Sequence, residues 1–304
     1  MRESPWGPLE VSDSHVHFFS HNFFKLLAGQ KPGLTVDSMG ATLGWEMPPE
    51  TPEDMAANWA HELDLHNVHR AVLIASLPGD EDSVSRAVES FPARFYGYFM
   101  VNPLAEGAVA RVQGALDRGH LHGLCLFPAM HRYSMHDDAA LAILDLVQAT
   151  RPATVVFVHC GVLSVGVRER LGLASLFDMR FSNPVDLHAI ARRYPHLRFV
   201  MPHFGAGFLR EALMVAELCP NVLLDTSSSN KWMAIEGLDL RIVFRRALDV
   251  VGPHRLLFGT DSSFFPRGWH EAIFEAQAKA LYEIGVKAEQ ARMIFSGNLH
   301  RLLG

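Results

Sequence analysis

Short apolar runs alternate along this chain with segments whose apolar residues recur every three or four positions. The runs are rich in β-branched and aromatic residues and end in polar or glycine-containing turns, as buried strands do. The segments between them have the spacing of helices that bury one face. We predict strands at 9–15, 71–75, 95–101, 123–127, 154–159, 198–203, 222–226 and 255–259, and helices at 53–65, 82–90, 106–118, 137–150, 184–194, 207–218, 240–250 and 270–284.

These strand-and-helix units predict an α/β fold, a (β/α)8 TIM barrel, rather than an open sheet with helices on both faces. We expect a single domain over residues 1–304, because no linker or low-complexity segment divides the chain. Residues 18–51, between the first strand and the first helix, are too long for an ordinary turn, and we interpret them as a lid insertion. Residues 287–303 are interpreted as an extra C-terminal helix, broken near Ser296-Gly297-Asn298, that caps the barrel.

Charge and cysteine content exclude several classes of partner. The formal net charge of -6 gives no basic surface for nucleic acid or for an anionic membrane. No apolar run is long enough to span a bilayer, and the first residues lack the apolar core of a signal peptide. Three scattered cysteines, Cys125, Cys160 and Cys219, are typical of a reducing compartment. We therefore expect a cytoplasmic protein that acts on a small-molecule substrate.

The stretch Asp13-Ser14-His15-Val16-His17 lies near the end of the first apolar run. Because side chains alternate along a strand, Asp13, His15 and His17 are expected on one face. Two neutral imidazoles that share a face can bind one divalent ion. The alternative is a pair of histidines that occurs by chance on an exposed strand, and this stretch alone does not exclude it.

The barrel prediction brings distant residues together, because the C-terminal ends of all the strands meet at one mouth. His159, His203 and Asp261 each follow a strongly apolar predicted strand. Each has another interpretation: His159 as a buried core histidine, His203 as a helix-start or anion-binding residue, and Asp261 as a turn residue. Their joint placement with His15 and His17 favours one shared metal or catalytic site.

Five motifs carry a resemblance to a known family. They are Asp13-Ser14-His15-Val16-His17, Val158-His159-Cys160-Gly161, Pro202-His203-Phe204-Gly205, Phe258-Gly259-Thr260-Asp261 and Phe295-Ser296-Gly297-Asn298-Leu299. The chain resembles the amidohydrolase superfamily, in the amidohydrolase-related branch that also contains aminocarboxymuconate-semialdehyde-type and aromatic-acid decarboxylases.

This resemblance implies roles for individual residues. His15, His17, His159 and Asp261 would hold the metal, and His203 would act on the substrate or on the attacking water. The resemblance also implies a homodimer as one oligomeric state.

The resemblance further implies how many ions are bound. Binuclear members of the superfamily bridge two ions with a carboxylated lysine or an acid at the end of the fourth strand. Residues 123–128 contain neither, and no lysine occurs between Lys31 and Lys231. We therefore predict one divalent ion, with zinc first and manganese as the alternative.

The residues leave the reaction open. A metal-dependent hydrolase of an amide, ester or lactone is the leading hypothesis, with Asp261 moving the proton and His203 stabilising an oxyanion or serving as acid. The alternatives are a non-oxidative decarboxylase or hydratase of a small carboxylic acid, and a barrel that binds a ligand without turnover.

The pocket lining is predicted from loop residues near the strand ends. Arg267, after the eighth strand, is a candidate to grip a substrate carboxylate, and a solvated loop arginine is the alternative. Aromatic residues in or near the expected mouth could line the pocket, although such residues are as often plain core. The aromatic candidates are Phe18, Phe19, Phe23, Trp45 and Trp232, and the polar candidates after the seventh strand are Asp225, Ser227, Ser228 and Asn230.

Overall fold

The computed structural model describes residues 1–227 and 231–304. Within these residues, eight strands form one sheet in which sequence neighbours pair in parallel, from β1 to β8. Each predicted strand is present, with ends displaced by a few residues. The strands are β1 (Ser12–His17), β2 (Arg70–Ala75), β3 (Phe95–Val101), β4 (Leu121–Leu126), β5 (Val155–Val158), β6 (Arg198–Met201), β7 (Val222–Asp225) and β8 (Leu256–Leu257).

Hydrogen bonds beyond the short strand β8 bring the two edges of the sheet together. The backbone N–H of Ser14 donates to the carbonyl of Phe258 at 2.8 Å, and that of His17 donates to Ser262 at 2.7 Å. The N–H of Asp261 in turn donates to the carbonyl of His15 at 3.0 Å. The sheet therefore curls into a nearly closed barrel, which confirms the predicted (β/α)8 fold.

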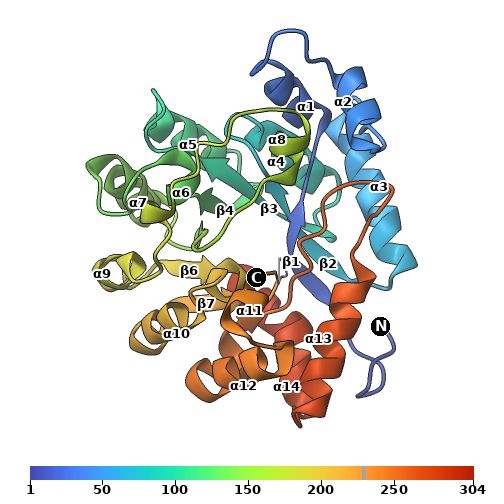
Figure 1. The fold of residues 1–304 in the computed structure, drawn as a ribbon, viewed down its shortest axis with the longest axis vertical. Helices are drawn as coiled ribbons and strands as arrows, with labels where there is room; N and C mark the ends of the chain where they lie inside the picture. The colour runs from blue at the N-terminus through green and yellow to red at the C-terminus, as the bar shows by residue number, and fades with distance from the viewer. Residues whose placement is uncertain (228–230) are drawn as a thin grey trace.

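Helices surround the barrel and connect its successive strands (Figure 1). Every predicted helix is present, and several short helices lie in the loops. The longer outer helices are α3 (Pro52–Leu65), α4 (Glu81–Ser90), α5 (Ala108–Asp117), α7 (Asp138–Thr150), α9 (Asp186–Arg193), α10 (Leu209–Leu218), α12 (Leu240–Val251) and α13 (Glu271–Glu283). The short ones include α6 (Pro128–His131), α8 (Gly166–Arg170), η1 (Met179–Phe181), η2 (Pro202–Gly205), α11 (Lys231–Glu236) and η3 (Pro253–Arg255).

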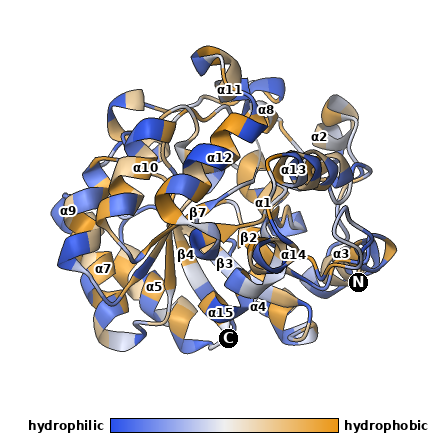
Figure 2. Cartoon of the chain, turned by 90° about the horizontal axis from the view of Figure 1, so that it is seen from below, coloured by the Kyte–Doolittle hydropathy of each residue, from blue (hydrophilic) through white to orange (hydrophobic). Residues whose placement is uncertain are grey.

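The hydrophobic core has two layers because successive strand residues face opposite sides. Tyr98 and Phe157 belong to a cluster inside the barrel. Phe99 and Trp59 belong to a larger cluster between the sheet and the helices. The strands are mostly hydrophobic along their length, whereas the outer helices carry both hydrophobic and hydrophilic segments (Figure 2). Burial on both faces explains why the strands appear in the sequence as continuous apolar runs.

The predicted insertion over residues 18–51 contains two helices that the apolar spacing does not indicate. They are α1 (His21–Ala28) and α2 (Val36–Leu43), which lie together at one corner of the molecule (Figure 1). Buried side chains of both helices, Phe24 and Leu43 among them, pack with Val167 of α8. The insertion thus forms a small core of its own beside the barrel.

The C-terminal segment closes the opposite end of the barrel. It consists of α14 (Ala288–Arg292), the π-helical turn η4 (Met293–Gly297) and α15 (Asn298–Leu303). Leu299 of α15 packs into the inner cluster, and the Tyr96 hydroxyl donates to the carbonyl of Gly304 at 2.9 Å. The predicted break falls at the junction of η4 and α15. Among the described residues, no helix has the length and apolar character needed to cross a membrane.

Candidate metal centre

A β-bulge lies immediately before the two histidines of β1. From Asp13 to Val16, β1 advances three residues while its partner β2 advances two. The extra residue turns the Asp13 side chain to the outer side of the sheet, where Trp269 Nε1 donates to its Oδ2 atom at 2.8 Å. The expectation that Asp13 shares a face with His15 and His17 is therefore wrong. Strict alternation of side chains does not continue through a bulge.

Asp13 instead ties the bulge to the segment after β8. Its Oδ1 atom accepts the backbone N–H of His15 at 2.9 Å and that of Thr260 at 3.1 Å. Burial raises the pKa of Asp13 to about 6, against the opposing effect of the hydrogen bonds from Thr260, His15 and Trp269. Asp13 thus positions the backbone on both sides of the site without facing it.

Three potential ligand atoms converge at the mouth of the barrel. His17 Nε2 lies 3.0 Å from Asp261 Oδ1, and His15 Nε2 lies 3.6 Å from the same oxygen. The two Nε2 atoms are 3.4 Å apart. Ligand atoms around a tetrahedral zinc ion, each about 2.1 Å from the metal, stand roughly 3.4 Å from one another. The three atoms therefore have the separation of a metal-ligand set.

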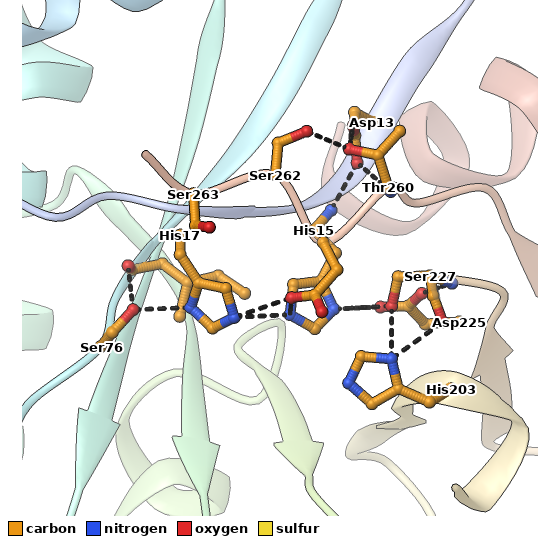
Figure 3. Close-up of polar contacts among 12 residues, drawn as sticks. Asp13, His15, His17, Ser76, His203, Asp225, Ser227, Thr260, Ser262 and Ser263 are labelled. Carbon is orange, nitrogen blue, oxygen red and sulfur yellow. Dashed lines mark hydrogen bonds and ion pairs between the residues drawn. The ribbon is translucent and has the colours of Figure 1, made fainter. Parts of the chain in front are cut away.

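The other ring nitrogen of each histidine is already engaged (Figure 3). His15 Nδ1 lies 2.8 Å from Asp225 Oδ2, and His17 Nδ1 lies 2.7 Å from Ser76 Oγ. The Ser76 hydroxyl donates to the carbonyl of Ile74 at 3.1 Å, so its oxygen accepts from His17. A carboxylate and an accepting hydroxyl both require Nδ1–H. Each Nε2 atom consequently directs a lone pair into the site.

Two lone pairs and a carboxylate oxygen in such close contact repel one another unless a cation lies between them. The pKa shifts of His15 and Asp261 likewise favour a positive charge between these atoms. Burial opposes protonation of His15, but Asp225 and then Asp261 outweigh it and raise the pKa of His15. Burial acts to raise the pKa of Asp261, but His17 and His15 hold that pKa well below its usual range. The donor set therefore fits a divalent ion of the zinc type.

His203 lies beside these residues on a strained backbone. It belongs to η2, where His203 and Phe204 have φ values of 56° and 53°, in the left-handed region that non-glycine residues rarely adopt. His203 Nδ1 donates to the carbonyl of Ser227 at 2.8 Å. Burial lowers the pKa of His203, so the ring is neutral and its Nε2 atom is an acceptor. The ring centroids of His203 and His15 are 5.1 Å apart.

His159 faces the same cavity but stands further from the three converging atoms. It is not part of the group whose ligand atoms lie within 4.8 Å of one another. Its ring centroid is 5.4 Å from that of His203, and its ring stacks on Phe127 at 5.1 Å. Burial lowers the pKa of His159 well below its usual value, which keeps the imidazole in the neutral form that binds metals.

These residues form the base of a cavity of about 430 Å³. One wall is aromatic: Trp45 stacks on Phe264 with ring centroids 4.1 Å apart, and Phe19 stacks on Trp45 with centroids 5.9 Å apart. Arginines from α8 and from the loop after β8 also line the cavity. The arginines that line the cavity are Arg168, Arg170 and Arg267.

The arginines give the cavity an excess of positive charge. Arg267 Nη2 donates to Ser263 Oγ at 2.8 Å and to the carbonyl of Asp261 at 3.2 Å, and its guanidinium lies over the Phe264 ring. Arg168 donates to the backbone carbonyl of Ala174, and Arg170 donates to that of Leu43 at the end of α2. Among the described residues that line the cavity, Asp261 supplies the one carboxylate. The cavity therefore favours an anionic small molecule.

Four of the predicted lining residues lie elsewhere. Asp225 and Ser227 contact His15 Nδ1 and are not among the described residues that line the cavity. Phe18 and Trp232 are buried in the outer core cluster and do not line the cavity among the described residues. Trp45 and Arg267 do line it. Ser228 and Asn230 lie outside the described residues.

Ser76, Arg168 and Arg170 are the site residues that the sequence reading missed. Ser76 directly follows β2, so the rule that strand ends meet at one mouth would have identified it. Arg168 and Arg170 belong to α8. The apolar pattern gives no signal for this helix.

The fold and the site define the class of protein: a (β/α)8 barrel with a histidine and carboxylate centre at the C-terminal mouth. The chain matches the amidohydrolase family over residues 12–304 and belongs to that family of enzymes. It is also 34% identical to the protein fluG of Emericella nidulans over 126 residues. That match covers 41% of this chain and 13% of the relative, so it spans a small part of the fungal protein.

Solved structures share the fold at low sequence identity. An uncharacterized TIM-barrel protein of Bordetella bronchiseptica has a TM-score of 0.65 and 18% identity, covering 97% of this chain and 98% of its own. An amidohydrolase of Burkholderia multivorans with bound zinc has a TM-score of 0.63 and 16% identity, covering 97% and 99%. A probable 2-pyrone-4,6-dicarboxylic acid hydrolase of Acinetobacter baumannii has a TM-score of 0.60 and 15% identity, covering 97% and 100%.

Proposed function

We propose that this protein is a hydrolase that uses one divalent ion, zinc first, to cleave an amide, ester or lactone bond of a small carboxylated compound. The observation that carries the proposal is the convergence of His15 Nε2, His17 Nε2 and Asp261 Oδ1 within 3.0 to 3.6 Å, with the Nδ1 atoms of both histidines engaged elsewhere. His159 completes the proposed ligand set. The zinc in the Burkholderia structure supports this choice of ion.

A divalent ion held by His15, His17, His159 and Asp261 would supply Lewis acidity, which lowers the pKa of water towards about 7 and polarises a substrate oxygen. Asp261 is held ionised and accepts a proton from the attacking water. It then passes this proton to the leaving group. His203, neutral with Nδ1–H donated to Ser227, offers an accepting Nε2 that orients this water. It can donate a proton to the substrate only after taking one up.

The positive lining supports a carboxylated substrate. Arg267 uses Nη2 for its hydrogen bonds to Asp261 and Ser263, and a guanidinium can bind a carboxylate with two parallel hydrogen bonds. The stacked Trp45 and Phe264 rings offer an aromatic surface for a flat or cyclic substrate. Two structural neighbours that are described as a probable and a putative 2-pyrone-4,6-dicarboxylic acid hydrolase support the same substrate class.

Turnover in isotopically labelled water tests the reaction. Carboxylated lactones, esters and amides are supplied to the zinc-loaded enzyme, and the product is examined for one labelled oxygen by mass spectrometry. Incorporation that is lost in His17→Ala and Asp261→Asn supports hydrolysis at this centre. Release of carbon dioxide without label in the product would overturn the proposal in favour of a decarboxylase.

A matched control separates loss of the centre from general damage. His61 is an exposed histidine of α3, far in sequence from every residue of the centre. His61→Ala should retain both the ion and the activity. Equal metal content and turnover in His17→Ala and in this control would exclude the centre as the site of reaction.

A further inference from the structure

A second group of potential metal ligands lies at the other end of the barrel. Glu10 precedes β1, His69 precedes β2 directly, and His300 belongs to α15. The strands are parallel, so these positions lie at the N-terminal ends of β1 and β2. The proposed catalytic residues follow the C-terminal ends. In Figure 2 the barrel is seen from the side, and α15 and the C-terminus lie at its lower edge.

The three side chains have the spacing of a ligand set. Their ligand atoms all lie within 4.8 Å of one another. Glu10 Oε1 is 3.7 Å from His69 Nδ1 and 3.8 Å from His300 Nε2. The two imidazole rings stack with centroids 5.6 Å apart, so both present an edge to the same carboxylate. The two distances to Glu10 exceed the tetrahedral value of roughly 3.4 Å by a few tenths of an ångström.

Two buried hydroxyl groups contact the proposed ligand atoms directly. Ser296 Oγ donates to Glu10 Oε1 at 2.7 Å, and Ser12 Oγ lies 3.1 Å from both Ser296 Oγ and His300 Nε2. These serines hold the carboxylate and one imidazole in place, and an ion bound here would replace the Ser12 contact at His300 Nε2.

The backbone and the local charge add to this arrangement. The N–H of His69 donates to the carbonyl of Val11 at 2.7 Å, which fixes its backbone beside Glu10. Arg70 also borders the group, but its Nη1 atom donates to the Tyr96 hydroxyl at 2.6 Å inside the barrel. Glu10 therefore supplies the negative charge that faces the two rings.

We propose that Glu10, His69 and His300 bind a divalent transition-metal ion of the zinc type, separate from the catalytic ion. Two imidazoles and one carboxylate match the ligand preference of such ions, and half-exposed side chains leave the remaining coordination position to water. The ion would join three segments that are far apart in the sequence. It would fasten α15, which closes this end of the barrel, to the starts of β1 and β2.

Zinc titration of the full chain tests this site. Zn²⁺ alone is the probe, and calorimetry is combined with elemental analysis after gel filtration. The wild-type protein should bind a second equivalent beyond the catalytic one. Glu10→Gln, His69→Ala and His300→Ala should each weaken that second step at least about tenfold. His61→Ala is the matched control and should bind like the wild type.

Catalysis and thermal unfolding give independent readouts. The variants should keep the wild-type kcat/KM with the first ion bound, because their side chains lie at the opposite end of the barrel. Added Zn²⁺ should raise the midpoint of thermal unfolding further in the wild type than in these variants. Glu10→Gln and His69→Ala leave α15 intact, so they decide the question if His300→Ala folds poorly.

Failure of this inference can be told apart from failure of the proposed function. His17→Ala removes a proposed catalytic ligand but should still bind one Zn²⁺ at Glu10, His69 and His300. A wild-type protein that binds no second equivalent would overturn the second site and leave the catalytic proposal standing. Unchanged second-step affinity in Glu10→Gln and His69→Ala would also overturn it.

Discussion

Asp225 Oδ2 lies 2.8 Å from His15 Nδ1, and both side chains are buried at the end of the barrel where β1 and β7 finish. This contact selects the ring tautomer, because a carboxylate requires the hydrogen on Nδ1. The Nε2 lone pair is then directed at Asp261 and His17 (Figure 3). A residue outside the proposed ligand set thus decides whether His15 can bind an ion.

Replacement of Asp225 by asparagine should weaken metal binding. The amide removes the negative charge that makes His15 a stronger ligand. Its NH2 group also takes the place of one carboxylate oxygen, so it faces a donor, either His15 Nδ1–H or the N–H of Ser227. We expect a loss of about 10- to 100-fold in zinc affinity, measured by competition with a chromogenic chelator. Asp178→Asn, on a surface ion pair with Arg180, is the control. Equal affinities in the two variants would contradict this role.

Replacement of Arg267 by alanine should raise KM. Loss of a charge-assisted, bidentate contact costs roughly 1.5–3 kcal/mol, which corresponds to an increase in KM of about 10- to 100-fold. The value of kcat should change little, because the hydrogen bond from Arg267 to Asp261 is made to the backbone carbonyl. Arg267→Lys should recover part of the loss.

Steady-state kinetics on matched substrates, with and without the carboxylate, check this expectation. The effect of Arg267→Ala should vanish for the uncharged substrate. A KM that is unchanged for the carboxylated substrate would remove Arg267 from the binding site.

The fold could be predicted from the sequence because both faces of each strand are buried. A strand such as Phe95–Val101 is then a continuous apolar run that differs plainly from the amphipathic helix after it. The helices of the insertion could not be predicted in this way. Helix α2 contains glycine, serine and threonine among its eight residues, and its buried side chains contact a local core rather than the sheet.

The site was only partly predictable for a related reason. The strand-end rule places His15, His17 and Asp261 at one mouth, but it assumes that side chains alternate regularly. The bulge in β1 breaks that rule and sends Asp13 outward. The sequence also cannot distinguish a cavity aromatic from a core aromatic. Trp45 lines the cavity, and Trp232 is buried in the outer core.

Gly161 allows two loops of the site to approach each other closely. A Cβ atom at this position would lie 2.2 Å from the carbonyl oxygen of Gly205, and the φ of Gly161 is +77°. Gly161→Ala should therefore destabilise the protein by at least about 2 kcal/mol and displace His203, which precedes Gly205 by two residues. Chemical denaturation and kcat measure the two effects.

A second glycine provides the comparison. Gly114 is exposed in α5, with nothing within 4 Å of an added Cβ. Gly114→Ala should stabilise the protein by roughly 0.5–1 kcal/mol and leave kcat unchanged, because alanine favours a helix. If Gly161→Ala behaved like Gly114→Ala, the close approach of the two loops would be wrong.

Asp80 joins the insertion to the loop after β2. Its carboxylate accepts hydrogen bonds from Ser20 Oγ at 2.8 and 2.9 Å, from Asn22 Nδ2 at 2.9 Å and from Ser83 Oγ at 2.6 Å. Ser20 also caps the start of α1. Burial raises the pKa of Asp80 to about 6, although the hydrogen bonds from Ser83, Asn22 and Ser20 act to lower it.

The raised pKa of Asp80 predicts the pH dependence of its contribution to stability. The folded protein holds this proton more tightly than the unfolded chain, so the contribution is full below pH 3.8 and is lost as the pH rises through about 6. Asp80→Asn stays neutral at every pH. The unfolding free energy of the wild type relative to this variant should therefore fall by about 2 kcal/mol between pH 4 and pH 7. Urea unfolding of both proteins measures the difference, and a constant or rising difference would contradict the assignment.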